Sequence, residues 1–121
     1  MSLNTENIKL IALSVFIFFL MLYLVNVNSV KVYRFYRPGC PWCINSKEEW
    51  DKFKSFCWLK LIKPIDINLD EPSNCEEKII DNFDIKSVPN VVAVYTDGRR
   101  IKYSDGERTA ESYLNWVNYN Y

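Results

Sequence analysis

An uncharged apolar run over residues 10–25 divides this 121-residue chain into two unequal parts. With its apolar flanks, the run approaches the roughly 17–25 residues that a helix needs to cross a bilayer. It has no polar face, so it does not suit the surface of a soluble domain. We therefore expect residues 1–29 to hold a short tail, a single-pass transmembrane helix and a linker, and residues 30–121 to form one folded domain.

Two alternatives to an uncleaved membrane anchor stay open at this stage. One is a signal peptide that is cleaved after Ser29, and the other is a buried core helix of a soluble protein. The side of the membrane is open too. Lys31, Arg34 and Arg37 follow the run, and the positive-inside rule then places residues 30–121 in the cytosol. Because these charges lie in a predicted strand, a lumenal or extracytosolic domain is the competing topology.

The composition narrows the chemistry of the domain. The chain has 15 basic and 15 acidic residues and no histidine. A nucleic-acid-binding face needs a clustered excess of Lys and Arg, so the balanced charge argues against a nucleic-acid partner. Without histidine, the commonest general base and the commonest metal ligand are missing. We expect no metal and no cofactor, and the four cysteines become the main candidates for chemistry.

Residues 30–121 alternate strand patterns with helix patterns. The segment 30–37 is β-branched and aromatic on both faces, which predicts a strand buried on both sides. Asp97-Gly98 predicts a hairpin. The later elements are predicted as helix 43–57, a strand within 59–69 that is entered near Leu61, helix 75–83, strands 91–95 and 100–103, and a helix from the cap Thr109 to residue 118. The order β-α-β-α-β-β-α predicts an α/β fold, with a four-stranded mixed sheet and helices on both faces.

The sequence Cys40-Pro41-Trp42-Cys43 marks the chemical centre, at a predicted strand-to-helix turn. At a helix N-terminus, free N–H groups and the helix dipole favour a thiolate, and the thiol pKa in such motifs falls to roughly 3.5–7.5. Pro41 suits the first helical turn. We therefore predict that Cys40 attacks a substrate disulfide and that Cys43 resolves the mixed disulfide. A zinc site or an inert disulfide is the alternative for this motif.

Residues 35–43 (FYRPGCPWC) resemble the active-site strand and motif of the thioredoxin-like superfamily. Ser87-Val88-Pro89 is similar to its cis-proline loop, residues 95–98 (YTDG) to the following hairpin, and residues 103–109 (YSDGERT) to a turn of protein disulfide isomerase domains. The resemblance covers residues 30–121, in a minimal, glutaredoxin-sized outline. It implies a cis Val88–Pro89 bond and an extended substrate peptide paired with Val88 beside the motif. Trp42 is expected to be exposed and to bind substrate.

Two positions depart from the family pattern. Arg34 stands where the family usually has a buried carboxylate, and Asp66 aligns with its buried lysine. We hypothesise an inverted ion pair between Arg34 and Asp66 beneath Cys43, which would tune its pKa together with Pro41. The alternative is that the Arg34 side chain extends to solvent.

The remaining cysteines are interpreted as structural. Cys57 lies on the apolar stripe of the helix 43–57 and is expected to be a small core residue. A Cys57–Cys75 disulfide is conceivable only if the domain faces an oxidising compartment.

Together these features predict a membrane-tethered thiol–disulfide oxidoreductase that acts on protein cysteines and exchanges electrons with an unidentified redox partner. The direction of electron flow is open. The alternatives are a non-catalytic, membrane-anchored binding module and a glutathione-dependent reductase of the glutaredoxin type.

Overall fold

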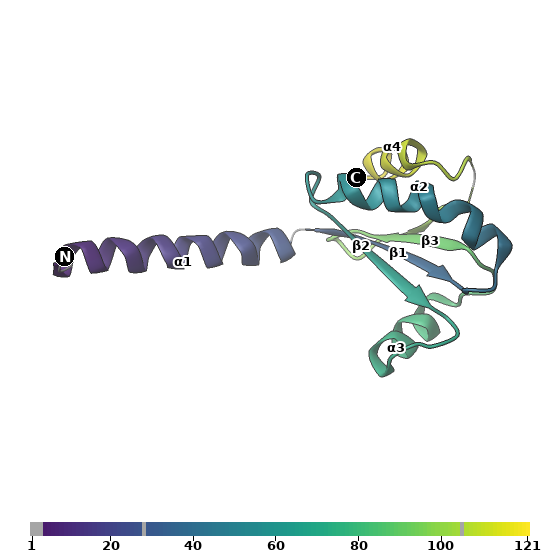
Figure 1. Ribbon diagram of the computed structural model, residues 1–121, viewed down its shortest axis with the longest axis horizontal. Coiled ribbons are helices and arrows are strands. Elements are labelled where there is room, and N and C mark those ends of the chain that lie inside the picture. The colour runs from purple at the N-terminus through teal and green to yellow at the C-terminus, as the bar shows by residue number, and fades with distance from the viewer. Residues whose placement is uncertain (1–3, 28, 105) are drawn as a thin grey trace.

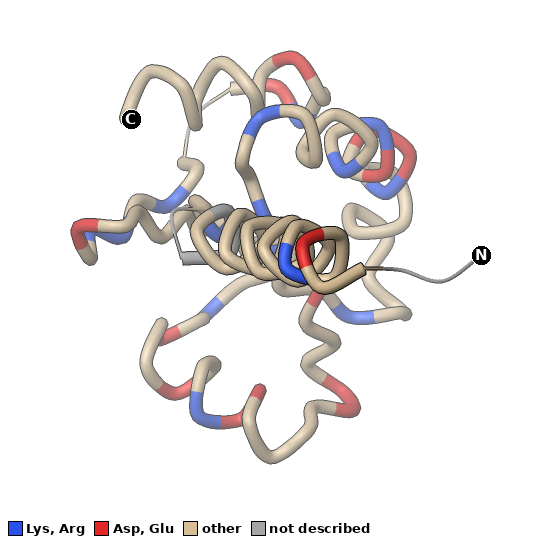
Figure 2. The backbone as a smooth tube through the Cα atoms, turned by 90° about the vertical axis from the view of Figure 1, so that its left-hand side faces the viewer, with Lys and Arg blue, Asp and Glu red and all other residues tan. Residues whose placement is uncertain are grey.

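The computed structural model describes residues 4–27, 29–104 and 106–121 of the chain. The helix α1 (Thr5–Val27) projects from one end of the domain and is not buried against it (Figure 1). Its charged residues are Glu6 and Lys9, close to its N-terminal end (Figure 2). The helix is long and apolar enough to cross a membrane. A core helix would be covered by the rest of the protein, so the buried-helix alternative does not fit.

A four-stranded mixed sheet forms the centre of the domain. Its strands are β1 (Val30–Tyr36), β2 (Ile62–Asn68), β3 (Asn90–Val94) and β4 (Arg100–Lys102), in the order β2-β1-β3-β4. The pair β1–β2 is parallel, whereas β3 runs antiparallel to both β1 and β4. Gly98, with φ +90°, lies in the turn between β3 and β4, at the predicted hairpin.

Helices cover both faces of this sheet, as predicted (Figure 1). On one face, α2 (Pro41–Cys57) and α4 (Ala110–Tyr119) bury Trp50, Phe53 and Tyr113 against the sheet. On the other face, α3 (Asn74–Phe83) packs against a smaller cluster that includes Phe35 and Ile67. Strand β1 therefore contributes to both clusters, which confirms the expectation of burial on both sides.

Strand β2 begins at Ile62, one residue after the predicted entry near Leu61. It begins there because the chain turns at the end of α2, where Leu59 N–H and Lys60 N–H donate to the carbonyls of Phe56 and Cys57. Leu61 then takes a positive φ of 55°. The alternation of Leu59 and Leu61 continues through this turn, so the apolar pattern alone extends back to residue 59.

Candidate active site

Cys40 and Cys43 lie at the junction of β1 and α2. Cys40 is the N-cap of α2, with φ −80° and ψ 118°, and Pro41 occupies the first helical turn. The Cys40 sulfur accepts a hydrogen bond of 3.2 Å from the backbone N–H of Cys43. Cys40 is partly exposed, Cys43 is only 2% exposed, and both thiols are free. The two thiols therefore differ in access to a large substrate.

The electrostatic environments of the two thiols also differ, and they favour the thiolate of Cys40 over that of Cys43. The hydrogen bond from the Cys43 side chain is the main cause that lowers the pKa of Cys40, and the backbone N–H groups of Cys43 and Trp42 and the charge of Arg34 add to it. Burial is the main cause that raises the pKa of Cys43, and its bond to Cys40 acts in the same direction. The outer thiol is thus the one that ionises first.

The loop before β3 lies beside Cys40. The Val88–Pro89 peptide bond is cis, Pro89 is buried, and the Cys40 sulfur lies 3.9 Å from the Val88 carbonyl oxygen. Trp42 is 69% exposed, as expected from the sequence. The structure therefore brings Cys40, Cys43, Val88 and Pro89 together, and Trp42 is exposed between the two cysteines of the motif.

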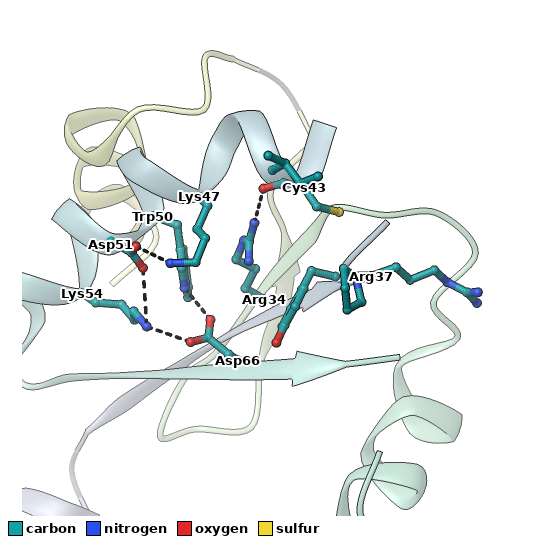
Figure 3. A pocket seen from close by; sticks show the side chains of 11 residues that line it. Arg34, Arg37, Cys43, Lys47, Trp50, Asp51, Lys54 and Asp66 are labelled. Atoms are coloured by element: carbon teal, nitrogen blue, oxygen red, sulfur yellow. Dashed lines mark hydrogen bonds and ion pairs between the residues drawn. The ribbon is translucent and has the colours of Figure 1, made fainter. Parts of the chain in front are cut away.

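The predicted Arg34–Asp66 ion pair is wrong. Arg34 is buried, at 3% exposure, but its guanidinium donates to the Cys43 carbonyl oxygen at 2.7 Å (Figure 3). Asp66 instead accepts hydrogen bonds from the Trp50 indole and from Lys54, the latter at 2.8 Å. The register places Arg34 and Asp66 side by side on β1 and β2, yet donors from α2 bind the carboxylate.

The guanidinium of Arg34 also lies against two aromatic rings. It is 5.0 Å from the ring centre of Tyr36 and 6.0 Å from that of Trp50. Cation–π attraction and the Cys43 carbonyl thus offset part of the cost of burying this charge. Arg34 makes no ion pair among the residues that the structure describes.

A pocket of about 320 Å³ opens under α2 beside these groups. Three residues that line this pocket or lie next to it were not predicted from the sequence as site residues: Ser46, Trp50 and Lys54. Trp50 and Lys54 hold Asp66 in its wall, and the Ser46 hydroxyl donates to the Cys43 carbonyl at 3.3 Å. All three lie on one helix in a pattern that also describes an ordinary amphipathic surface, so no sequence signal distinguished them.

The two other cysteines do not form a disulfide. Cys57 is fully buried in the cluster beneath α2 and α4, whereas Cys75 is exposed at the start of α3, on the other face of the sheet. The interpretation of Cys57 as a core residue is confirmed. The Cys57–Cys75 bond, which the sequence left open, does not form, because the sheet separates the two thiols.

Comparison with known proteins rests on structure alone, since no family model and no curated protein matches the sequence. The J-Trx1 fragment of ERdj5 is 21% identical, with a TM-score of 0.58 over 80% of this chain and 45% of that one. The first two thioredoxin domains of Naumovozyma dairenensis Eps1p are 20% identical, with a TM-score of 0.61 over 76% and 35%.

The first thioredoxin domain of mouse protein disulfide-isomerase A4 is 21% identical, with a TM-score of 0.62 over 97% of this chain and 71% of that domain structure. The chain spans less than half of the ERdj5 fragment and about a third of the Eps1p structure. Such identities establish the fold and leave activity to be argued from the site. The chain therefore has a thioredoxin-like fold.

Proposed function

We propose that this protein is a thiol–disulfide oxidoreductase that acts on protein cysteines and is held at a membrane by α1. The observation that carries the redox assignment is the asymmetry of the two thiols. Cys40 is partly exposed with a lowered pKa, and Cys43 lies one helical turn deeper with a raised pKa. An accessible nucleophile with a shielded partner suits disulfide exchange.

In the reducing direction, the Cys40 thiolate attacks one sulfur of a substrate disulfide. A mixed disulfide forms, and the first substrate sulfur leaves as a thiolate. Cys43 then loses its proton and attacks the Cys40 sulfur, which releases the second substrate thiolate. Two electrons pass to the substrate, and the protein keeps a Cys40–Cys43 disulfide. The reverse sequence oxidises a substrate dithiol, and a redox partner restores the starting state.

The proton of Cys43 needs an acceptor in this scheme. At the position where thioredoxins usually have a carboxylate, this chain has Arg34, which has no acceptor atom. The carboxylate of Asp66, which stands opposite Arg34 in the β1–β2 register, is bound by Trp50 and Lys54. We therefore propose that the first substrate thiolate to leave takes the Cys43 proton, directly or through water. Arg34 stabilises the negative charge that this leaves on the Cys43 sulfur.

Substrate binding is assigned to the surface around Cys40. The Val88 carbonyl points at the Cys40 sulfur, so an extended peptide that pairs with the Val88 backbone would carry its own cysteine to Cys40. The exposed Trp42 ring offers apolar area on the other side of the motif.

Insulin reduction by the full-length protein in detergent, with dithiothreitol as the electron source, tests this function. We expect Cys40→Ser to lower turnover to the rate of dithiothreitol alone. Reduced Cys43→Ser, mixed with insulin after the dithiothreitol has been removed, should accumulate mixed disulfides that appear on non-reducing gels. Cys75→Ser removes an exposed thiol on the other face of the sheet and should leave the rate unchanged. Undiminished turnover by Cys40→Ser would overturn the assignment, and turnover only with glutathione would favour the glutaredoxin-type alternative.

The membrane tether is tested separately. An uncleaved α1 should keep the full chain in the membrane pellet after carbonate extraction, and the protein should retain its first 29 residues. A mature protein that begins at Val30 would show instead that the segment is a signal peptide.

A further inference from the structure

The exposed apolar side chains of the domain fall into two groups. Among the described residues outside α1, Trp42 and Ile44 lie beside the cysteine motif. The others form what we call the basal patch: Phe56, Trp58, Leu59, Leu61, Tyr119 and Tyr121. Trp58 is 78% exposed and Tyr119 is 90% exposed. Exposed aromatic and aliphatic residues gathered at one place mark an interaction surface.

The basal patch surrounds the point where the chain passes from α1 to β1. The backbone N–H of Val30 donates to the Leu61 carbonyl at 3.1 Å, so the α2–β2 turn is fixed to the first residue of β1. The ring of Tyr121 lies 6.3 Å from that of Tyr95, which follows the last residue of β3. Since β3 runs antiparallel to β1, Tyr95 lies at the Val30 end as well. Figure 1 shows the ends of α2 and α4 at this end of the domain.

The connection from α1 is too short to separate this surface from a membrane that α1 crosses. Helix α1 ends at Val27, three residues before Val30, and three residues span at most about 10 Å. The headgroup layer on each side of the hydrocarbon core is itself about 5–7 Å thick. The end of the domain that carries the basal patch is therefore held close to the headgroups of a membrane that α1 spans.

The residue types of the basal patch match those that are enriched in the headgroup layer of a membrane. Trp and Tyr are the residues enriched where a membrane meets water, because their rings combine apolar area with a polar atom. Lys31, Lys60 and Lys63 are exposed at the same end, and none makes an ion pair within residues 29–104 or 106–121. Lys31 and Lys63 face each other in the β1–β2 register, so two positive charges lie side by side. Anionic headgroups would relieve this repulsion.

The backbone at Leu61 adds an independent observation. Its φ of 55° lies in the left-handed region, which a leucine rarely adopts, and its side chain is 44% exposed. Glycine or asparagine is the usual residue at such a position. Strained backbone positions cluster at functional surfaces, which supports a contact at Leu61.

We propose that the basal patch lies in the headgroup layer of the bilayer that α1 spans, with a preference for anionic lipid, and so fixes the orientation of the domain. This proposal rests on the proposed membrane anchor, because α1 brings the patch to the lipid. It does not depend on the redox chemistry of Cys40 and Cys43.

Fluorescence quenching in vesicles tests the proposal with the full-length chain. The protein is reconstituted into phosphatidylcholine vesicles with and without brominated acyl chains, and Trp58→Phe is compared with Trp42→Phe, its matched control at the far end of the domain. We expect brominated lipid to quench the wild type and Trp42→Phe, and the quenched component to disappear in Trp58→Phe. Equal quenching of Trp58→Phe and the wild type would overturn the proposal.

A second experiment, in which the charge of the lipid is varied, tests the preference for anionic lipid. Replacement of about a third of the lipid by phosphatidylglycerol should increase quenching of the wild type but not of the triple variant Lys31→Gln, Lys60→Gln, Lys63→Gln. An equal increase in both would overturn the anionic preference. Carbonate extraction of the same samples distinguishes failure of the anchor from failure of the patch. Release of the full chain would overturn the membrane anchor and with it this proposal. A protein that stays in the membrane while Trp58 is not quenched would overturn only the proposal that the basal patch lies in the headgroup layer.

Discussion

The guanidinium of Arg34 donates a hydrogen bond of 2.7 Å to the carbonyl oxygen of Cys43, one helical turn inside α2. The bond joins the central strand to the active-site helix and keeps a positive charge below both thiols. The charge of Arg34 lowers the pKa of Cys40 and opposes the burial that raises the pKa of Cys43. The protein thus favours thiolates with a cation at a position where thioredoxins usually have an anion.

Replacement of Arg34 by methionine should make the protein more reducing. Without the guanidinium, the thiol pKa of Cys40 rises, the reduced dithiol is less stable, and the reduction potential falls by about 30 mV for each unit of pKa. Stability should fall as well, because the variant loses the bond to the buried Cys43 carbonyl, and a hydrogen bond from a charged group contributes about 1.5–3 kcal/mol. Glutathione redox titration measures the potential. Arg37→Met, at an exposed neighbouring arginine, is the matched control, and an unchanged potential in Arg34→Met would contradict the role.

Asp66 should act on stability rather than on the redox potential. Asp66→Ala leaves the indole N–H of the buried Trp50 without its partner, which costs about 1–3 kcal/mol of unfolding free energy. Asp66→Asn keeps an acceptor for Trp50 and loses only the partly exposed pair with Lys54, worth about 0–1 kcal/mol. Urea unfolding measures both variants. A shift in potential for Asp66→Asn, without one for Arg34→Met, would reverse the two assignments.

Cys57 should make the reduced protein sensitive to alkaline pH. Burial raises the pKa of its thiol to about 12 from an ordinary value of 9.0. The unfolded chain therefore loses this proton first, and stability that is present below pH 9 declines as pH rises toward 12, by at most about 1.4 kcal/mol per pH unit. Cys57→Ala should flatten this decline, measured by urea unfolding at pH 8, 9 and 10. Cys75→Ala should keep the wild-type slope, and equal slopes in all three proteins would exclude Cys57 as the cause.

Glu49 should give the protein its sensitivity to acid. Its carboxylate accepts the backbone N–H of Ala110 at 3.1 Å, so a side chain of α2 binds the first turn of α4. This bond is the main cause that lowers the pKa of Glu49. The stability it contributes is therefore present above the ordinary value of 4.5 and is lost as pH falls below it. Glu49→Gln should be less stable at pH 7 and lose less on acidification, with Glu48→Gln as the exposed control, in melting curves from pH 3 to 7. Parallel curves for wild type and Glu49→Gln would rule this out.

Local patterns were enough to predict the order of the elements and the position of the cysteine motif. A run of β-branched and aromatic residues on both faces identified β1, and helical spacing of Trp50 and Phe53 identified α2. Thr109 is the N-cap of α4, where its side chain accepts the Ser112 N–H. Each of these signals depends on residues close together in the chain, which is why their boundaries fall within a few residues of those observed.

Contacts between elements could not be read in this way. The neighbouring places of Arg34 and Asp66 on β1 and β2 suggested an ion pair, and the register is as expected. The outcome depended on Trp50 and Lys54, which reach Asp66 from α2, and on the Cys43 carbonyl, which accepts the bond from the guanidinium. The sequences of β1 and β2 contain no sign that donors on α2 compete for Asp66.

The direction of β1 has a consequence for which proteins can react. Strand β1 begins at the α1 end of the domain, and its seven residues rise about 3.3 Å each, so the cysteine motif stands roughly 20 Å beyond Val30. With α1 in a bilayer, Cys40 then stays at a nearly constant height above the membrane surface. It diffuses with the protein in the two dimensions of the membrane. A disulfide in another protein of that membrane, at matching height, is met at a much higher effective concentration than one in free solution. Under the proposed anchoring and redox function, height above the lipid would select among disulfides independently of the side chains at the active site.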